Sequence, residues 1–236
     1  MRQCEAIMAR LRPAAGAVLR RAYWCLVVLV CSWSMALAGP ASVRVAKVFD
    51  GDTCRLEDGR RVRLAGIDAP ETAHGREPAR YYAAAAAERL FALTRGRALQ
   101  LAVVGEGSDR FGRIIGELFL PGGASVGETL VAEGAAFVYW HSGLPEALLE
   151  RYLAAQRRAM DAGRGFWPHI LKLPSPAQPY VGNAASRRFH APGCPDARRI
   201  SPRNRVLLPD LAAAFRQGFA PARDCTPWPN EGTGRP

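Results

Sequence analysis

Apolar and polar residues alternate in the first half of the chain as they do in half-buried strands. The segment "SVRVAKVF" (42–49) alternates over most of its length, and "TCRLEDGRRVRLAGI" (53–67) contains two alternating runs joined by Asp58-Gly59. Alternation places every second side chain on one face of a sheet, and Asp-Gly is a strong hairpin turn. The pattern therefore predicts one strand followed by a β-hairpin.

The middle of the chain switches between helical and extended patterns. The alanine-rich segment 78–96 predicts a helix that ends at Gly96, and segments 98–105 and 113–120 predict two further strands. A short helix is expected to begin after Ser125, because serine is a favoured N-cap residue.

The last part of this region predicts one more extended stretch and one long helix. An extended aromatic stretch (137–140) precedes a long helical pattern over 144–163. Five strands, with a helix between the third and the fourth, match the small Greek-key barrel of the OB type. We therefore expect an α+β domain over residues 41–168, a five-stranded OB-fold barrel with about three helices.

The composition changes after Trp167. Residues 169–179 are rich in proline and are predicted to form a linker. Residues 180–236 contain clustered His and Cys and one helical stretch, "DLAAAFRQG". A chain of this length can hold one domain with a proper core and a small appendage, so we expect 180–236 to be a small C-terminal module.

The N-terminus has the pattern of a signal peptide. Arg20 and Arg21 precede an apolar run, and Ala36-Leu37-Ala38 has the small residues of a cleavage site. The run is shorter than the roughly 20 residues that a membrane span needs. We expect residues 1–38 to be removed and the protein to be exported, periplasmic or secreted, with no stable membrane association. An uncleaved membrane anchor is the alternative.

The chain is basic even without this segment. Its formal net charge is +11, and residues 1–38 contain five arginines and one acidic residue, so +7 remains on the mature chain. A basic exported protein suits a polyanionic partner such as nucleic acid, although basic exported proteins without such a partner also exist. We expect a monomer.

Acidic residues gather at one end of the predicted hairpin. Asp52 enters its first strand and Asp68 follows its second, so antiparallel pairing brings the two near each other. Pro70 restricts Ala69 to an extended conformation and so directs its carbonyl group. Carboxylates and backbone carbonyls are the ligands of hard cations. The arrangement therefore suggests a cation site, with Glu71 just beyond it, where it can hold a water molecule.

Two arginines complete this set. Cleavage of a phosphodiester adds negative charge to a group already surrounded by anionic oxygens, and arginines stabilise such charge through bidentate hydrogen bonds. Arg63 lies five residues before Asp68, an odd separation that a regular strand would place on opposite faces, so a bulge or the strand end must bring them together. Arg113 closes "SDRFGR", where Gly112 allows an unusual backbone angle. Taken singly, these features also fit turns and surface ion pairs.

Four segments together resemble the staphylococcal nuclease (thermonuclease) family. In order between Val43 and Trp167 they are "VFDGDTCRLEDGRRVRLAGIDAPE", "SDRFGRIIGELFL", "VGETLVAEGAAFVYW" and "GRGFWP". The resemblance implies Ca²⁺-dependent hydrolysis of DNA and RNA that leaves 3′-phosphates. It also implies that Arg63 and Arg113 bind and stabilise the phosphoryl group and that Glu71 assists the attacking water.

The implied calcium ligands are the carboxylates of Asp52 and Asp68 and the backbone carbonyl of Ala69. The best-known family member has threonine at the last of these positions. Alanine keeps the carbonyl and lacks the hydroxyl. Beside Arg113, Arg110 and Phe111 are candidates for contact with a phosphate and a base, while packing of Phe111 into the barrel wall is an equal alternative.

Three residues of the C-terminal module can form either a metal site or a disulfide. His190, Cys194 and Cys225 are three-quarters of a zinc site, and Ala222 stands where a second Cys of a Cys-x-x-Cys pair would be. With Cys54, the mature chain has three cysteines, so at most one bridge forms. An oxidising compartment favours a Cys194–Cys225 disulfide over the metal site, and Cys54 is expected to be a small buried residue.

Two other classes of function compete with a nuclease. One is a non-catalytic OB module that binds nucleic acid, and the other is an exported protein whose acidic residues only bind calcium. The co-occurrence of the arginines and the acidic residues argues against both, because a simple calcium site has no use for cations beside it.

The position of the signal cleavage gives a first testable prediction. We expect the mature protein to begin at Gly39, because the small residues Ala36 and Ala38 precede that bond. N-terminal sequencing and the intact mass of the exported protein measure this directly. A secreted chain that still begins at Met1 or Met8 would contradict it.

Overall fold

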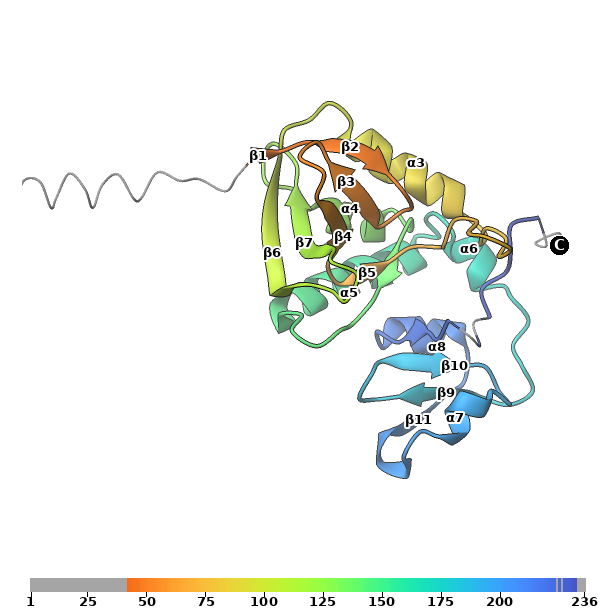
Figure 1. Ribbon diagram of the computed structural model, residues 1–236. Helices are drawn as coiled ribbons and strands as arrows, with labels where there is room; N and C mark the ends of the chain where they lie inside the picture. The colour runs from red at the N-terminus through yellow and green to blue at the C-terminus, as the bar shows by residue number, and fades with distance from the viewer. Residues whose placement is uncertain (1–41, 224, 226, 233–236) are drawn as a thin grey trace, which may run out of the picture. The chain divides into compact units, whose positions relative to one another are not determined.

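The alternating segments of the first half form one curved six-stranded sheet with the order β1-β6-β7-β4-β3-β2 (Figure 1). The computed structural model describes residues 42–223, 225 and 227–232, so the predicted signal peptide lies outside the described residues. The strands are β1 (Ser42–Val43), β2 (Val45–Val48), β3 (Thr53–Leu56), β4 (Arg61–Leu64), β6 (Leu99–Ser108) and β7 (Ile114–Phe119).

This sheet confirms the predicted fold class, an OB-type barrel with helices. The predicted first strand is divided into β1 and β2 at Arg44, so the sheet has six strands instead of five. The hairpin β3–β4 is antiparallel, as expected, and β4 pairs with β7 in parallel. The parallel pairing joins the hairpin to the second half of the barrel and places Arg63 opposite Ile115.

Three helices pack against the barrel: α3 (Ala83–Thr94), α4 (Val126–Ala132) and α5 (Glu146–Asp161). The side chain of Ser125 caps α4 by accepting a hydrogen bond from the backbone N–H of Glu128 at 3.1 Å, which confirms the predicted helix start. Helix α3 begins five residues later than predicted. The backbone N–H groups of Arg80 and Tyr81 donate to the carbonyls of Glu71 and Pro229 instead of continuing a helix.

The C-terminal residues form a second, four-stranded sheet with the order β11-β9-β10-β12. Its strands are β9 (Tyr180–Asn183), β10 (Arg188–His190), β11 (Arg205–Leu208) and β12 (Ala220–Pro221). The connecting helices are α7 (Pro195–Arg198), the 3₁₀ helix η2 (Pro202–Asn204) and α8 (Leu211–Arg216). Helix α8 packs on this sheet (Figure 1).

An aromatic core joins this sheet to the barrel domain. Its buried members are Phe137, Ala159, Met160, Phe166, Trp167, Ile170, Tyr180, Phe189, Leu208, Leu211, Ala214, Phe215, Phe219, Ala220 and Trp228. Helix α6 (Trp167–Ile170) occupies the start of the predicted linker and buries two side chains in this core. Residues 42–236 accordingly group as one compact unit, so the predicted linker at 169–179 connects two sheets that share a core.

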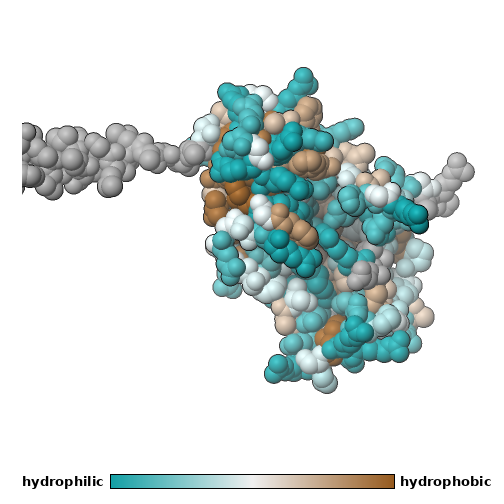
Figure 2. All heavy atoms as spheres, viewed as in Figure 1, coloured by the Kyte–Doolittle hydropathy of each residue, from teal (hydrophilic) through white to brown (hydrophobic). Residues whose placement is uncertain are grey.

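The other buried cluster fills the space between the barrel and helices α3, α4 and α5. Cys54 belongs to it and is fully buried, which confirms its predicted place. The surface in Figure 2 is mainly hydrophilic with scattered apolar residues. None of the helices in the described part of the chain combines the length and the apolar composition of a membrane span.

The shared aromatic core predicts that the two sheets unfold together. Phe215 packs against the rings of Phe137, Trp167, Phe189 and Trp228, with centroids between 4.9 and 6.2 Å away. Phe215→Ala should therefore lower the free energy of unfolding of the whole protein by about 3–5 kcal/mol. Urea unfolding followed by far-UV circular dichroism and by tryptophan fluorescence measures this change.

The matched control is Leu207→Ala, because Leu207 lies in the same sheet and is 63% exposed. This variant should stay within about 0.5 kcal/mol of wild type. Separate transitions for the two probes in the wild-type protein would contradict a shared core.

Candidate active site

The end of the hairpin brings three charged side chains together. In the β3–β4 register Thr53 faces Arg63, so Asp52 lies beside the strand that carries the arginine. After Leu64 the chain turns and enters a short separate strand, β5 (Ile67–Asp68), which pairs with β8 (Phe137–Val138). Asp68 thus leaves the plane of the hairpin, which is how it reaches Arg63 despite the odd separation.

The guanidinium of Arg63 lies between the two carboxylates. Its Nη1 donates to Asp52 Oδ1 and its Nη2 donates to Asp68 Oδ1. Asp52 also accepts hydrogen bonds of 2.8 Å from the Thr53 hydroxyl and from the backbone N–H of Ala69. Both aspartates are buried. Two buried carboxylates need such compensation, because an unpaired buried charge is strongly destabilising.

Burial raises the pKa of a carboxyl group and pairing with Arg63 lowers it, and the balance differs between the two aspartates. Burial raises the pKa of Asp68 to about 6, although Arg63 opposes the shift. Burial also acts to raise the pKa of Asp52, but the Arg63 guanidinium and the Ala69 N–H outweigh it and hold that pKa below its ordinary value. The pKa of Arg63 is raised, because the two carboxylates outweigh its burial.

Sequence reasoning did not assign a role to Asp50, which belongs to the same turn. Its Oδ1 accepts a hydrogen bond of 3.0 Å from the backbone N–H of Asp52. Burial and the neighbouring charge of Asp52 raise the pKa of Asp50 to about 7. The repeated aspartate in "DGD" was the sequence signal that could have included Asp50 in the site, but the same pattern is common in ordinary turns.

Gly51 explains why this turn can lie so close to the rest of the site. A Cβ at this position would lie 2.6 Å from the Cβ of Ala69 and 2.7 Å from the Cβ of Ala86. Only glycine allows such a close approach of the backbone. The approach brings the Asp52 carboxylate within reach of the Ala69 N–H and so joins the two halves of the carboxylate site.

The donor chemistry of this site fits a hard divalent cation. The Asp52 and Asp68 carboxylates converge on one guanidinium, so their oxygens already lie close together around a positive charge. Ala69 follows Asp68 directly and brings a backbone carbonyl. Oxygen donors of this kind suit Ca²⁺ and Mg²⁺.

Arg113 lies at the end of the β6–β7 connection. Its Nη2 forms an ion pair with Asp109 at 2.7 Å, and Asp109 also accepts from the backbone N–H groups of Phe111 and Arg113. Gly112 has φ = 71°, a left-handed conformation and thus one of the unusual backbone angles that glycine allows. Phe111 is 63% exposed, with the Arg110 guanidinium 4.7 Å from its ring centroid. The ring therefore projects to the surface and does not pack into the barrel wall.

One cavity brings the two predicted arginines together. This arginine cavity, of about 530 Å³, is lined by Arg63, Arg110, Phe111, Arg113, Tyr139 and Arg223, among others. Tyr139 is half-buried, with Arg63 5.9 Å and Arg188 3.4 Å from its ring centroid. Arginine side chains and aromatic rings in one open cavity are the features that bind single-stranded nucleic acid.

A second cavity contains the predicted glutamate. This carboxylate cavity, of about 570 Å³, is lined by Asp68, Ala69, Glu71 and Arg223, among others. Glu71 is exposed and forms an ion pair with Arg223, with Nη2 2.8 Å from Oε1. Arg223 comes from the C-terminal module, 152 residues after Glu71, and no local motif could have predicted its place beside the site.

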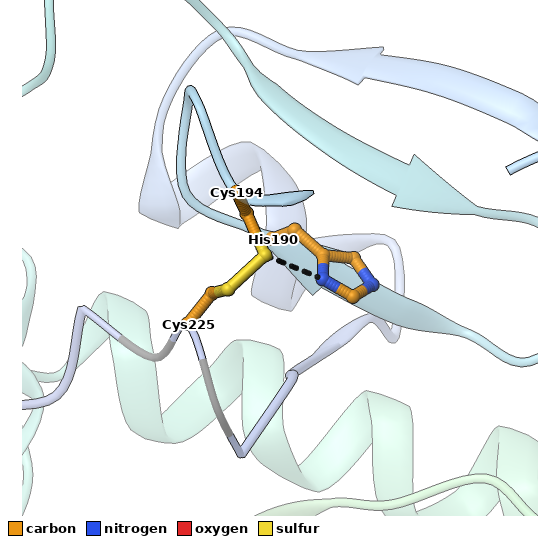
Figure 3. Close-up of side chains that lie close together, drawn as sticks. All are labelled: His190, Cys194 and Cys225. Carbon is orange, nitrogen blue, oxygen red and sulfur yellow. Dashed lines mark hydrogen bonds between the residues drawn. A yellow bond between two sulfur atoms is a disulfide. The ribbon is translucent and has the colours of Figure 1, made fainter. Parts of the chain in front are cut away.

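The structure joins Cys194 and Cys225 in a disulfide, with Cα atoms 6.1 Å apart (Figure 3). His190 Nδ1 lies 3.5 Å from Cys194 Sγ. Within the described residues these three side chains form the one close group of three or more potential ligands from His, Cys, Asp and Glu. Zinc binds thiolates, and a disulfide has none. Burial raises the pKa of the remaining thiol, Cys54, to about 12, which makes it a poor nucleophile.

An OB barrel that holds arginines and buried carboxylates beside an open cavity defines the class of a nucleic-acid hydrolase. The sequence model of the family described as "Staphylococcal nuclease homologue" matches residues 61–169. The chain belongs to this family, and it is a nuclease.

Three relatives illustrate the similarity. A protein of Escherichia coli named "Uncharacterized endonuclease" is 32% identical over 157 residues, which cover 65% of this chain and 94% of the relative. "Probable endonuclease LCL3" of Schizophyllum commune is 33% identical over 50% of this chain and 43% of the relative. "Endonuclease YhcR" of Bacillus subtilis is 24% identical over 74% of this chain and 16% of the relative.

The buried pairing of Arg63 gives a prediction for stability. Arg63→Met leaves Asp52 and Asp68 buried without their cation, so the free energy of unfolding should fall by about 3–5 kcal/mol at neutral pH. Urea unfolding measured across a range of pH checks this. The low pKa of Asp52 in the folded protein contributes stability above its unfolded pKa, and that contribution is lost as the pH falls. The deficit of the variant should therefore shrink toward acidic pH.

The matched control is Arg60→Met at the opposite end of the hairpin. Arg60 pairs with Asp58 at 2.6 Å, but both side chains are about half exposed, so its loss should leave stability unchanged. An equal effect of the two substitutions would contradict the assignment of Arg63 to a buried charge cluster.

Proposed function

We propose that this protein is an exported, monomeric, calcium-dependent nuclease that hydrolyses the phosphodiester bonds of DNA and RNA and leaves 3′-phosphates. One observation carries the proposal: Arg63 in strand β4 and Arg113, directly before strand β7, line the same open cavity, and the buried carboxylates lie directly behind Arg63. The basic chain, with a formal charge of +7 after removal of the predicted signal peptide, agrees with a polyanionic substrate.

The two arginines act on the phosphoryl group. Both guanidiniums present planar, fork-like donors that fit the oxygens of a phosphate. Negative charge grows on these oxygens as water attacks, so donors already in place stabilise the transition state more than the bound substrate. Their present pairing with carboxylates keeps both guanidiniums oriented at the cavity wall.

Glu71 assists the attacking water. It is exposed in the carboxylate cavity beside Asp68, so its carboxylate can accept a proton from a water molecule at the phosphorus. The new bond forms between this water oxygen and phosphorus, and the bond from phosphorus to the 5′ oxygen breaks. The 5′ oxygen leaves as a hydroxyl after it gains a proton from solvent, Glu71 returns its proton to solvent, and the phosphate stays on the 3′ side.

Calcium would be held by the carboxylates of Asp52 and Asp68 and the backbone carbonyl of Ala69. When bound there, the cation supplies positive charge next to the phosphoryl oxygens and a site for water. The chain's own residues prepare this site, because Gly51 and the Ala69 N–H fix Asp52, and Arg63 compensates both carboxylates before any cation arrives.

Phe111 and Tyr139 provide the surfaces for bases. Phe111 is exposed beside Arg110, and Tyr139 lines the same cavity with the guanidiniums of Arg63 and Arg188 near its ring. Stacking on such rings is tolerant of sequence, because every base has a flat face. We infer that unpaired strands are preferred, since stacked bases inside a duplex cannot reach these rings.

The proposal predicts the loss of catalysis without loss of folding. Glu71→Ala and Arg113→Ala should each cost at least about 2.7 kcal/mol of transition-state stabilisation, roughly a hundredfold in kcat. Cleavage of a labelled single-stranded DNA by the mature protein, with Ca²⁺ and with a chelator, measures the effect. End-group analysis of the products tests for the 3′-phosphate.

Arg60→Ala and Glu57→Ala are matched controls, because both residues are exposed near the turn at the other end of the hairpin. They should keep wild-type activity. Binding of DNA without any cleavage would refute the proposed reaction, and equal activity with calcium and with chelator would refute the calcium assignment alone.

A further inference from the structure

A C-terminal segment crosses from the small sheet back to the active site. We call residues 220–231 the strap; the structure describes all of them except 224 and 226. Its first residues form β12, which pairs in parallel with β10. The N–H of Ala220 donates to the carbonyl of Arg187 at 2.9 Å, and the N–H of Ala222 donates to that of Phe189 at 2.8 Å. These bonds fix the strap up to the residue before Arg223.

The disulfide holds the strap on the other side of Arg223. Cys225, two residues further along, is bonded to Cys194, which precedes helix α7 of the small sheet (Figure 3). A covalent bond here limits the positions that Arg223 can adopt. Arg223 is therefore held between a strand pairing and a disulfide.

The end of the strap is attached to the segment that follows Glu71. The N–H of Tyr81 donates to the carbonyl of Pro229 at 2.9 Å, and the indole N–H of Trp228 donates to the carbonyl of Tyr81 at 3.0 Å. The Trp228 ring is buried in the aromatic core. The Arg80 guanidinium donates to Asn230 Oδ1 at 2.9 Å, while the Arg80 N–H donates to the Glu71 carbonyl. Hydrogen bonds thus join the strap to the segment 71–81, which begins at the predicted catalytic glutamate.

Arg223 is the residue of the strap that lies closest to the predicted glutamate, with which it forms an ion pair. It lines both the arginine cavity and the carboxylate cavity. Its side chain is 70% exposed and pairs with Glu71, which is 50% exposed. An exposed pair of this kind is weak, and a guanidinium has five donors. A phosphate in either cavity can therefore accept hydrogen bonds from Arg223 at little cost in free energy.

Two arginines of the arginine cavity are already paired with carboxylates, so a further cationic side chain helps to bind a polyanionic substrate. Arg63 is compensated by two buried carboxylates and Arg113 by Asp109. Nucleic acid brings a phosphate at every nucleotide, so a substrate that spans the two cavities presents more than one phosphate to the protein.

We propose that Arg223 is a further phosphate-binding arginine of the active site, brought there by the disulfide-held strap. It binds a phosphate next to the scissile one and so contributes to substrate affinity. This inference rests on the proposed nuclease function and extends the substrate site to the C-terminal module.

The experiment compares Arg223→Ala with wild type by steady-state cleavage of single-stranded DNA and by DNA binding. Loss of one charged contact should raise KM about tenfold. The kcat should be unchanged, because a neighbouring phosphate is bound equally in ground and transition states. The dependence of log Kd on log salt should become shallower by about 0.7, the value for one phosphate contact on a single strand. Arg223→Lys keeps the charge and should retain the wild-type salt dependence.

Arg199→Ala is the matched control, because Arg199 belongs to the same module and pairs with Asp196 on an exposed surface. It should leave KM unchanged. An Arg223→Ala variant with wild-type KM and salt dependence would overturn the proposal. So would a higher kcat at constant KM, since Arg223 would then only restrain Glu71.

Removal of the disulfide is an independent test of the proposal. Cys194→Ser with Cys225→Ser should raise KM by a similar factor, and adding Arg223→Ala should cause little further change. A full additional tenfold effect would show that Arg223 acts without the disulfide and overturn the role of the strap. If wild type binds DNA but does not cut it, the proposed function fails, while the binding measurements still decide whether Arg223 contacts phosphate.

Discussion

The site depends on one buried interaction, the guanidinium of Arg63 between the carboxylates of Asp52 and Asp68. Two ionised carboxylates are not stable side by side in a buried site without a cation, since desolvation and mutual repulsion both oppose their charged forms. The surrounding backbone serves this arrangement: Gly51 brings the first carboxylate close to Ala69, and the short strand β5 carries the second out of the plane of the hairpin. A cation held by these carboxylates would share them with Arg63, which already compensates their charge.

The second constraint is the aromatic core that joins the small sheet to the barrel. Its rings come from both parts of the chain, with Phe137 and Trp167 packed against Phe215. Because Phe137 directly precedes Val138 in the strand that pairs with β5, the core also supports the backbone that carries Asp68. The small sheet is therefore connected to the site by packing, by the strap and by the ion pair of Arg223 with Glu71.

Much of the barrel could be predicted from local pattern. The hairpin with its Asp-Gly turn, the cap at Ser125 and the long helix α5 depend on neighbouring residues, so periodicity and turn residues suffice to find them. The start of α3 could not be predicted, because the residues before Ala83 have the composition of a helix but their N–H groups bond to Glu71 and to Pro229, the latter far away in the sequence. The linker was likewise predicted from prolines, and composition does not reveal that Trp167 and Ile170 are buried in a shared core.

The sequence alone determined the family and the barrel and pointed to Asp52, Arg63, Asp68, Glu71 and Arg113 as candidates, because motifs and strand patterns are encoded over short stretches. Only the tertiary structure decided how these residues meet: the separate strand that turns Asp68 toward Arg63, the cavity common to Arg63 and Arg113, and the approach of Arg223 to Glu71. The physical reason is that such contacts depend on packing and electrostatic compensation between residues distant in the chain. Local preferences for helix, strand or turn therefore do not predict these contacts.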